Sequence, residues 1–190
     1  PDGFDTCKYD QKKLMGLCGI TVDEIEIDTF LNNSRNVKSE VIEPTLNKLK
    51  RTISSLKEVN QKELILSLKL EKSLKKLKED GTYNAFAIRC WPEMFTEYGG
   101  AICAPASMLT ENKVPCACEA DVYGAVTQLI LQEVSGQPVF LTDIVDIDVD
   151  DDTGVFWHCG QAPISMCNPK IKPTATIHSN RKMPLLFEFP

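Results

Sequence analysis

The sequence has no long apolar run, very few histidines and none of the common glycine-rich nucleotide-binding motifs. No apolar stretch approaches the roughly 18–20 residues that a membrane-spanning helix needs, so we expect no membrane segment. Neither a G-x-G-x-x-G motif nor a P-loop occurs, which removes the usual signals for dinucleotide and nucleoside-triphosphate binding. With only two histidines, a serine or cysteine nucleophile activated by histidine is unsupported.

Positive charge is in deficit over the chain as a whole. The net charge of −6 argues against a nucleic-acid partner. Residues 40–79 are the exception, because they carry ten lysines and arginines against six glutamates. These lysines alternate with glutamates at helical spacing, which favours a solvated helix face over a patch that binds polyanions.

The length and the cysteine content of the chain limit the classes of protein to which it could belong. The 190 residues suffice for about one domain or slightly more, and an apolar fraction of 43% is enough for a core. No secretory signal is visible, and the sequence starts at Pro1, so we expect a piece of a longer protein or a processed chain. Eight cysteines in apolar, strand-like surroundings predict reduced thiols in a cytoplasmic protein. A zinc site remains an alternative, with these possible ligands: Cys116, Cys118, His158 and Cys159.

The hydrophobic pattern predicts an α/β protein. Apolar residues recur every three or four positions over 40–79, with a break near Asn60, which indicates two consecutive helices or one bent helix. Residues 20–27 alternate apolar and acidic side chains, as a strand does. Continuous apolar runs at 84–90, 114–118 and 139–145 then alternate with helical segments. This order is typical of a Rossmann-like parallel sheet flanked by helices.

The segments around the third strand run complete the expected fold. Residues 121–135 predict a helix that ends at Gly136 and buries one apolar face, made of Val122, Ala125, Val126, Leu129, Ile130 and Val134. Beyond residue 145, acidic and apolar residues alternate, and Thr153-Gly154 predicts a turn into a hairpin with 155–159. We expect a short β or extended segment from there to residue 190.

Two acidic side chains stand where a ligand site is expected. Glu119 follows the strand at 114–118, and Asp143 lies near the end of the strand at 139–145. Parallel α/β sheets bind ligands beyond the carboxyl ends of their strands. Two carboxylates with one imidazole suit Mn²⁺ or Mg²⁺. By pattern alone, solvated loop acids are the commoner explanation. The acidic run at 146–154 is not an EF-hand, since its sixth and twelfth positions lack the required glycine and glutamate.

The residues from Ala85 to Gly160 resemble the L-fucose/L-arabinose isomerase superfamily, and the fucose isomerase branch in particular. The matching stretches are Cys90-Trp91-Pro92, 100–107, 115–121, the strand that holds Asp143, and His158-Cys159-Gly160. In fucose isomerases a glutamate and an aspartate 24 positions apart bind Mn²⁺ and carry the proton transfer, and Glu119 and Asp143 have that spacing.

The resemblance implies a metal-dependent aldose–ketose isomerase that acts on a small sugar through an enediolate. Glu119 and Asp143 would be catalytic residues and ligands of Mn²⁺ (or Mg²⁺ or another divalent cation), and His158 is the candidate third ligand by its likeness to the arabinose branch. Residues 1–137 would form the central α/β domain and 138–190 the beginning of the carboxyl-terminal domain. The full-length protein would be a homo-oligomer, and the isolated chain inactive. A non-catalytic sugar-binding or regulatory module on the same scaffold is the alternative.

Overall fold

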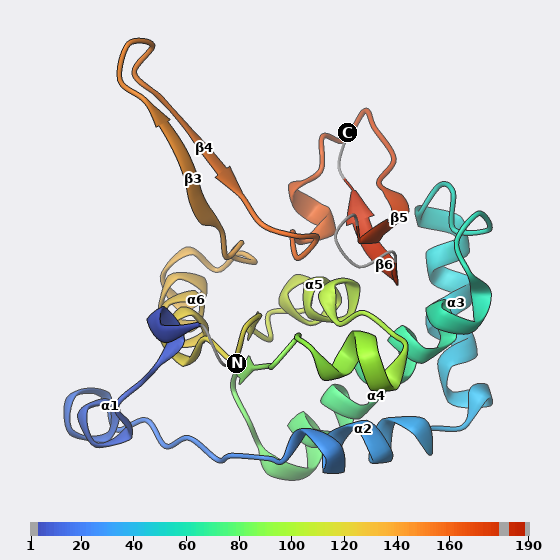
Figure 1. Cartoon of the computed structure of the whole chain (residues 1–190), viewed down its shortest axis with the longest axis horizontal. Coiled ribbons are helices and arrows are strands. Elements are labelled where there is room, and N and C mark those ends of the chain that lie inside the picture. Colours follow the sequence, from blue (N-terminus) through green and yellow to red (C-terminus); the bar gives the residue numbers. More distant parts are fainter. Residues whose placement is uncertain (1–3, 179–182, 189–190) are drawn as a thin grey trace.

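The fold is a mixed α/β structure in which helices dominate, as the computed structural model of the chain shows (Figure 1). The structure describes the backbone of residues 4–178 and 183–188 and the side chains of residues 4–177. The helices are α1 (Gln11–Cys18), α2 (Ile27–Arg35), α3 (Ser39–Thr52), α4 (Gln61–Gly81), α5 (Cys103–Glu111) and α6 (Val122–Ser135). The strands are β1 (Phe86–Ala87), β2 (Cys116–Ala117), β3 (Asp143–Asp148), β4 (Thr153–Trp157), β5 (Thr174–His178) and β6 (Met183–Glu188).

Two consecutive helices, α3 and α4, account for the helical pattern of residues 40–79, as predicted. The side chain of Asn60 accepts a hydrogen bond from the Lys62 amide at 3.0 Å, and this cap starts α4 afresh after the break. α4 runs through the centre of the fold and packs against α2, α3 and α5. Its fully buried leucines join two hydrophobic clusters, and they are Leu64, Leu68, Leu70 and Leu74.

The expected parallel sheet is reduced to one pair of short strands. β1 and β2 pair in parallel, with Phe86 opposite Cys116 and Ala87 opposite Ala117. The predicted third parallel strand is wrong: residues 139–142 form no strand, and Asp143–Asp148 pairs with Thr153–Trp157 in an antiparallel hairpin. Gln128 on α6 donates to the Val139 carbonyl oxygen at 3.0 Å, so a side chain takes an acceptor that a sheet neighbour would have used. A Rossmann-like sheet therefore does not form within the described residues.

Residues 20–26, expected as part of a strand, are instead extended chain without a strand partner. They run from α1 to α2 along the edge of the molecule (Figure 1). Most of their side chains are exposed, and α2 already begins at Ile27. Alternation of apolar and acidic residues permits a strand, but a strand also needs a neighbouring edge to pair with. In the described part of the chain, this segment belongs to none of the three two-stranded sheets.

α6 forms as predicted and ends at Gly136, which adopts the left-handed conformation with a φ of 66°. Its buried face, however, differs from the prediction towards the carboxyl end. Val134 is 82% exposed and Ile130 53% exposed, whereas Gln128 and Gln132 are buried. The Gln132 side chain donates to the Lys113 carbonyl oxygen at 3.1 Å, which offsets the cost of burying its amide N–H.

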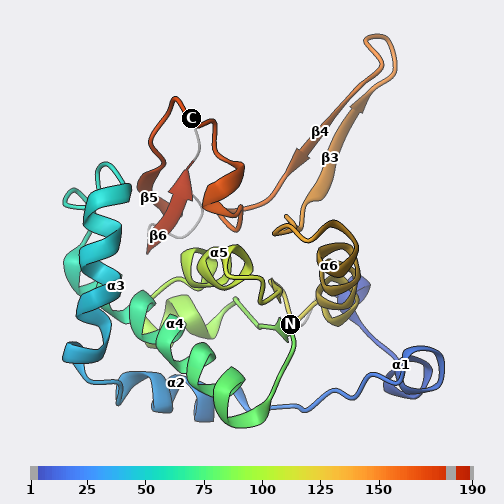
Figure 2. The same cartoon turned by 180° about the vertical axis from the view of Figure 1, so that it is seen from behind.

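Two hairpins complete the fold, and the two opposite views in Figures 1 and 2 show how differently they are placed. The β5–β6 hairpin packs against α4 and α5. The β3–β4 hairpin projects away from the helices, and every residue in both of its strands is exposed. The side chain of His178, at the end of β5, lies outside the described residues. None of the helices described here has the length and apolar composition needed to cross a membrane.

Candidate functional site

The site begins at a tight turn that follows β2. Glu119 and Ala120 occupy the two central positions, and both have positive φ angles, 61° and 56°. The Asp121 amide donates to the Cys118 carbonyl oxygen at 2.9 Å and closes the turn. Positive φ at both central residues is the signature of a type I′ turn, which normally uses glycine or asparagine. Holding glutamate and alanine in this conformation costs about 1–3 kcal/mol per residue. The surrounding contacts must therefore impose it.

The second acid of the turn has a structural role. The Asp121 carboxylate accepts a hydrogen bond from the Gly124 amide at 2.8 Å and caps the amino terminus of α6. A Cβ on Gly124 would lie 2.4 Å from a carboxylate oxygen of Asp121, so the cap needs glycine at that position. Of the two neighbouring acids, Asp121 thus starts the helix and Glu119 remains available for chemistry.

The foot of the β3–β4 hairpin brings two further predicted residues together. Asp143 lies opposite Trp157 in the strand register, and His158 follows Trp157 directly. The chain after His158 is fixed to α5, because the buried hydroxyl of Ser107 donates to the Ala162 carbonyl oxygen at 2.6 Å. Ser107 is therefore an anchor for the loop that carries His158.

The charges of Glu119, Asp143 and His158 act on one another. Burial raises the pKa of the Glu119 carboxyl, the positive charge of His158 opposes the rise, and the negative charge of Asp143 adds to it. Burial lowers the pKa of His158, but the neighbouring Cys159 and the two carboxylates outweigh it, so the net shift is upward. The structure thus gathers all three predicted residues into one electrostatic neighbourhood, although Glu119 and Asp143 are 24 positions apart.

The donor set fits a divalent cation by its chemistry. Two carboxylates and an imidazole are suitable ligands for Mn²⁺, and Nδ1 of His158 is buried without a hydrogen-bond partner. In the described part of the chain, however, no three His, Cys, Asp or Glu side chains converge closely enough to form a finished metal site. The metal therefore stays a prediction that rests on the residue types and their shared neighbourhood.

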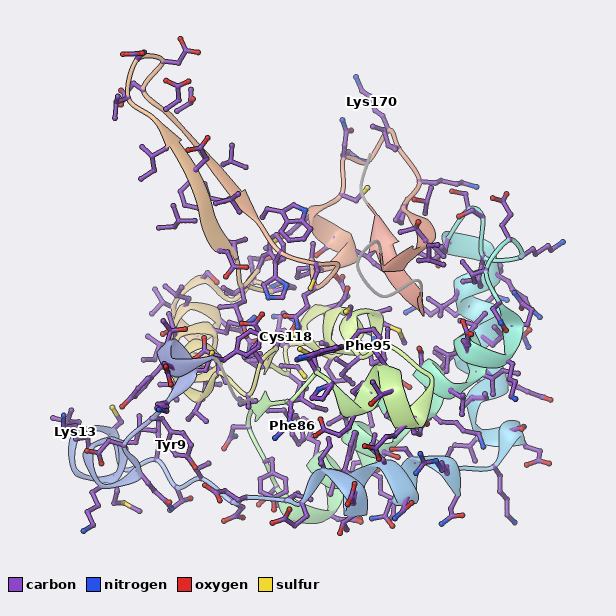
Figure 3. The ribbon with its side chains drawn as sticks, viewed as in Figure 1. Tyr9, Lys13, Phe86, Phe95, Cys118 and Lys170 are labelled. Atoms are coloured by element: carbon purple, nitrogen blue, oxygen red, sulfur yellow. The ribbon has the colours of Figure 1, made fainter. Side chains whose placement is uncertain are left out.

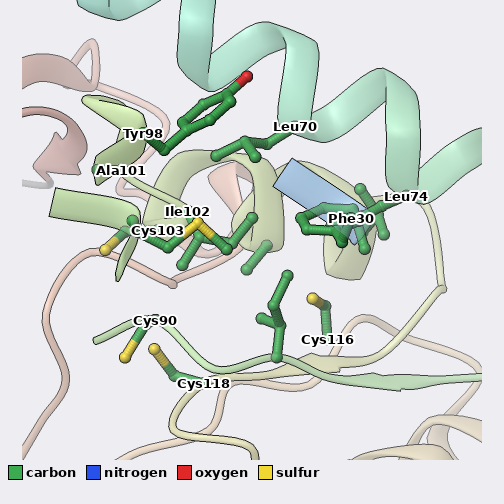
Figure 4. Close-up of a cluster of buried hydrophobic side chains, with 14 of the residues drawn as sticks. Phe30, Leu70, Leu74, Cys90, Tyr98, Ala101, Ile102, Cys103, Cys116 and Cys118 are labelled. Carbon is green, nitrogen blue, oxygen red and sulfur yellow. The ribbon is translucent and has the colours of Figure 1, made fainter. Parts of the chain in front are cut away.

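Four buried or half-buried thiols lie beneath this site. The neighbouring Cys90 and burial raise the pKa of the Cys118 thiol, and the neighbouring Cys159 and burial raise that of Cys103. Figure 4 shows the sulfurs of Cys90 and Cys118 side by side, with Cys116 apart from them. All eight cysteines lie in the described part of the chain, and each is free of disulfides.

The four ligands of the zinc alternative form no metal-binding cluster in the described part of the chain. Burial alone raises the pKa of Cys116 to about 12, and no other thiol acts on it. Cys116 is therefore a small residue of the main hydrophobic cluster, which also contains Cys118. The commoner role of buried cysteine, as a small hydrophobic residue, accounts for it.

Sequence analysis did not assign Cys90 a role at the site. The segment after β1 runs alongside the turn, since the Ala120 amide donates to the Ile88 carbonyl oxygen at 3.0 Å. The pKa of Cys90 is lowered by the neighbouring Cys118 and, to a smaller extent, by the backbone of Glu119. A parallel pairing of 84–90 with 114–118 predicts that Cys90 lies near Cys118, but no sequence motif indicates the turn that brings Glu119 to the same place.

The amino-terminal segment, in which Figure 3 labels Tyr9 and Lys13, reaches α6. The amino-terminal segment is held there by the Tyr123 hydroxyl, which accepts a hydrogen bond from the Asp10 amide at 3.0 Å. Burial raises the pKa of the Cys7 thiol, and the charges of Asp121 and Glu119 also raise it. Cys7 therefore lies within electrostatic reach of the site.

Curated relatives match the chain along its whole length, although no protein-family model matches it. It is 29% identical over 189 residues to a protein of Clostridium sp. (strain MSTE9) and 27% identical over 190 residues to one of Priestia aryabhattai. It is also 28% identical over 192 residues to a protein of Alkalicoccus urumqiensis. Each of these relatives is named sulfoquinovose isomerase. The chain spans 42% to 43% of their length.

Proposed function

We propose that this chain is the part of a sugar isomerase that supplies Glu119, Asp143 and His158, and that its substrate is sulfoquinovose or a closely similar aldose. The observation that supports the proposal is that Asp143 and His158 lie at the foot of the β3–β4 hairpin, where their charges act on the pKa of Glu119. The likeness to three sulfoquinovose isomerases over all of the chain supports the same reaction and suggests the sugar.

The reaction needs two proton transfers. An aldose becomes a ketose when one proton moves from carbon 2 to carbon 1 and another moves from the oxygen on carbon 2 to the oxygen on carbon 1. The enediolate between them carries negative charge. A carboxylate beside carbon 2 can take the first proton and return it to carbon 1. Because burial raises the pKa of Glu119, this carboxyl is suited to both taking up and releasing a proton.

Asp143 and His158 are the other two residues of the proposed active site. Asp143 lies on the exposed hairpin foot, where it can assist the proton transfer between the two oxygens. The buried Nδ1 of His158 remains available as a ligand or a donor. A Mn²⁺ ion, or another divalent cation held by these three residues, would stabilise the negative charge that develops on the substrate oxygens. The variants Glu119→Gln and Asp143→Asn test which of the two acids abstracts the proton from carbon 2.

The remaining expectations belong to the same proposal. We place the protein in the cytoplasm because its eight cysteines are free thiols. The boundary near residues 137 and 138 between a central and a carboxyl-terminal domain follows the end of α6 at Ser135. The full-length protein would act as a homo-oligomer. The isolated chain, which covers under half of its relatives, would be inactive.

The test is conversion of sulfoquinovose to its ketose by the full-length protein, followed by NMR in deuterated water. We expect turnover with deuterium incorporation at carbon 1 for the wild type, and near-complete loss of turnover for Glu119→Gln and for Asp143→Asn. If Glu119 is the base, Glu119→Gln also loses exchange of the proton on carbon 2. Sugar binding without turnover in the wild type would favour a non-catalytic sugar-binding module and contradict the proposal. Fast turnover by the isolated 190 residues would contradict its inactivity.

A further inference from the structure

The β3–β4 hairpin has one acidic face and one apolar face, and a β-bulge in β3 separates the two kinds of side chain. Successive side chains of a regular strand point to opposite faces, so without an irregularity Asp143 and Asp146 would lie on different faces. The register shifts between Ile144 and Asp146, and Val145 is the extra residue. The bulge therefore brings Asp146 and Asp148 to the face that carries Asp143.

Trp157 lies on the acidic face. It stands opposite Asp143 in the strand register, and opposite residues of an antiparallel pair share one face, with Cβ atoms about 4.5–5.5 Å apart. Phe156 stands opposite Ile144, on the apolar face. A Cβ on Gly154 would lie 3.2 Å from the Phe156 ring, so this ring lies over Gly154 on the apolar side. The two neighbouring aromatic side chains thus belong to opposite faces.

The position of Trp157 connects it to the proposed active site. Across the strands it faces Asp143, and the next residue in the chain is His158, which is buried. Trp157 itself is 54% exposed, so the described fold leaves about half of a large aromatic residue open beside these two residues. An accessible aromatic surface therefore borders the carboxylate that we propose to be catalytic.

An aldose presents two kinds of surface, and this arrangement offers a partner for each. Its hydroxyl groups donate hydrogen bonds, which a carboxylate such as that of Asp143 accepts. Its C–H bonds form apolar patches whose slightly positive hydrogens are attracted to the negative face of an aromatic ring. Small-molecule sites likewise combine aromatic walls with a few polar groups that fix the orientation of the ligand. A carboxylate beside an exposed indole is therefore suited to a polyhydroxylated substrate.

We propose that Trp157 is a substrate-contacting residue, whose indole stacks against the C–H face of the sugar and holds the sugar beside Asp143 and His158. This inference rests on the proposed function for the identity of the sugar, whereas the shared face of Trp157 and Asp143 is a property of the hairpin. The stacking surface of the sugar is the same before and during the reaction. Loss of the ring should therefore raise KM more than it lowers kcat.

Phe156 offers a matched control. It is the neighbour of Trp157 in β4, is aromatic and 61% exposed, and lies on the apolar face of the hairpin. Phe156→Leu and Trp157→Leu both replace an exposed ring of the same strand with the same aliphatic side chain. A general effect on the hairpin should appear in both variants, whereas loss of a contact with the sugar should appear only in Trp157→Leu.

The experiment compares Trp157→Leu, Trp157→Phe and Phe156→Leu in the full-length protein. KM and kcat are measured with sulfoquinovose. Calorimetry gives the Kd of the alditol made by reducing sulfoquinovose at carbon 1, which has no carbonyl group and cannot isomerise. We expect Trp157→Leu to raise KM and this Kd by about tenfold, the upper part of what one aromatic contact contributes. Trp157→Phe keeps a ring and should stay within about threefold of the wild type. Phe156→Leu should match the wild type.

Equal changes in Trp157→Leu and Phe156→Leu would overturn the proposal, and so would wild-type affinity for the alditol in Trp157→Leu. A loss in Trp157→Phe as large as that in Trp157→Leu would contradict stacking on the ring. If Trp157→Leu does not fold, Trp157 is buried against another part of the full-length protein and the proposal is wrong. If the wild type binds the alditol but does not isomerise sulfoquinovose, the proposed function fails, while the affinities of the variants still test the contact with Trp157.

Discussion

The carbonyl oxygen of Ile88 accepts a hydrogen bond from the amide of Ala120 at 3.0 Å, and so joins the end of one short parallel strand to the strained turn after the other. Ala120 has a φ of 56°, a conformation in which its Cβ is crowded. The turn that carries Glu119 thus keeps an unfavourable backbone conformation because the contacts around it impose it.

Replacing Ala120 with glycine should stabilise the protein. Glycine adopts positive φ without a Cβ clash, so we expect Ala120→Gly to raise the free energy of unfolding by up to about 1 kcal/mol. Urea denaturation measures the change. Ala125→Gly, in the interior of α6, is the control and should lower the free energy of unfolding by about 1 kcal/mol or more. A loss of stability in Ala120→Gly equal to that of the control would contradict the strained turn.

Asp121 should prove to be a structural acid. Its carboxylate caps α6, so Asp121→Ala should lower the free energy of unfolding by about 0.5–2 kcal/mol. Asp121→Asn keeps an acceptor and should lose much less. Asp150→Ala, at the exposed end of the hairpin, should change stability by no more than about 0.5 kcal/mol. Equal losses for Asp121→Ala and Asp150→Ala in thermal or urea unfolding would remove the capping role.

The stability of the metal-free protein should depend on pH through Glu119. Since burial raises its pKa in the folded state, the folded protein holds the Glu119 proton more tightly than the unfolded chain does. This contribution to stability is complete below the pKa of an unfolded glutamate and is lost as pH rises through the raised value. Glu119→Gln cannot ionise, so its stability relative to wild type should increase over that window. Urea denaturation in the presence of a chelator, repeated from pH 4 to pH 8, measures it, and a flat difference would contradict the shift.

The β3–β4 hairpin should add little to the stability of the isolated chain. Ile147 is 64% exposed on this hairpin, so we expect Ile147→Ala to change the free energy of unfolding by no more than about 0.5 kcal/mol. Leu70 is fully buried on α4, and Leu70→Ala should cost about 2–5 kcal/mol. A large loss for Ile147→Ala in the monomeric chain would show that the hairpin packs against the helices in solution.

The sequence predicted the local elements better than their pairing. The break at Asn60 and the end of α6 at Gly136 follow from local caps, which short patterns report well. Residues 139–142 were misassigned because an apolar run says nothing about whether Gln128 will take the Val139 carbonyl oxygen. The site residues came from a resemblance and a spacing of 24. The positive φ angles at Glu119 and Ala120 occur in a turn that is hydrogen-bonded to Ile88, a distant contact that no local pattern contains.

We propose that Glu119 and Asp143 bind one divalent cation together, and Mn²⁺ binding measured by loss of the free-ion EPR signal is the decisive experiment. The full-length wild type, Glu119→Gln, Asp143→Asn and, as a control from the same acidic hairpin, Asp150→Asn would be titrated under identical conditions. We expect the two site variants to bind Mn²⁺ at least about 10- to 100-fold more weakly, the loss that even an outer partner of a metal ligand causes. Asp150→Asn should bind like the wild type. Equal Mn²⁺ affinity in all four proteins would contradict the account.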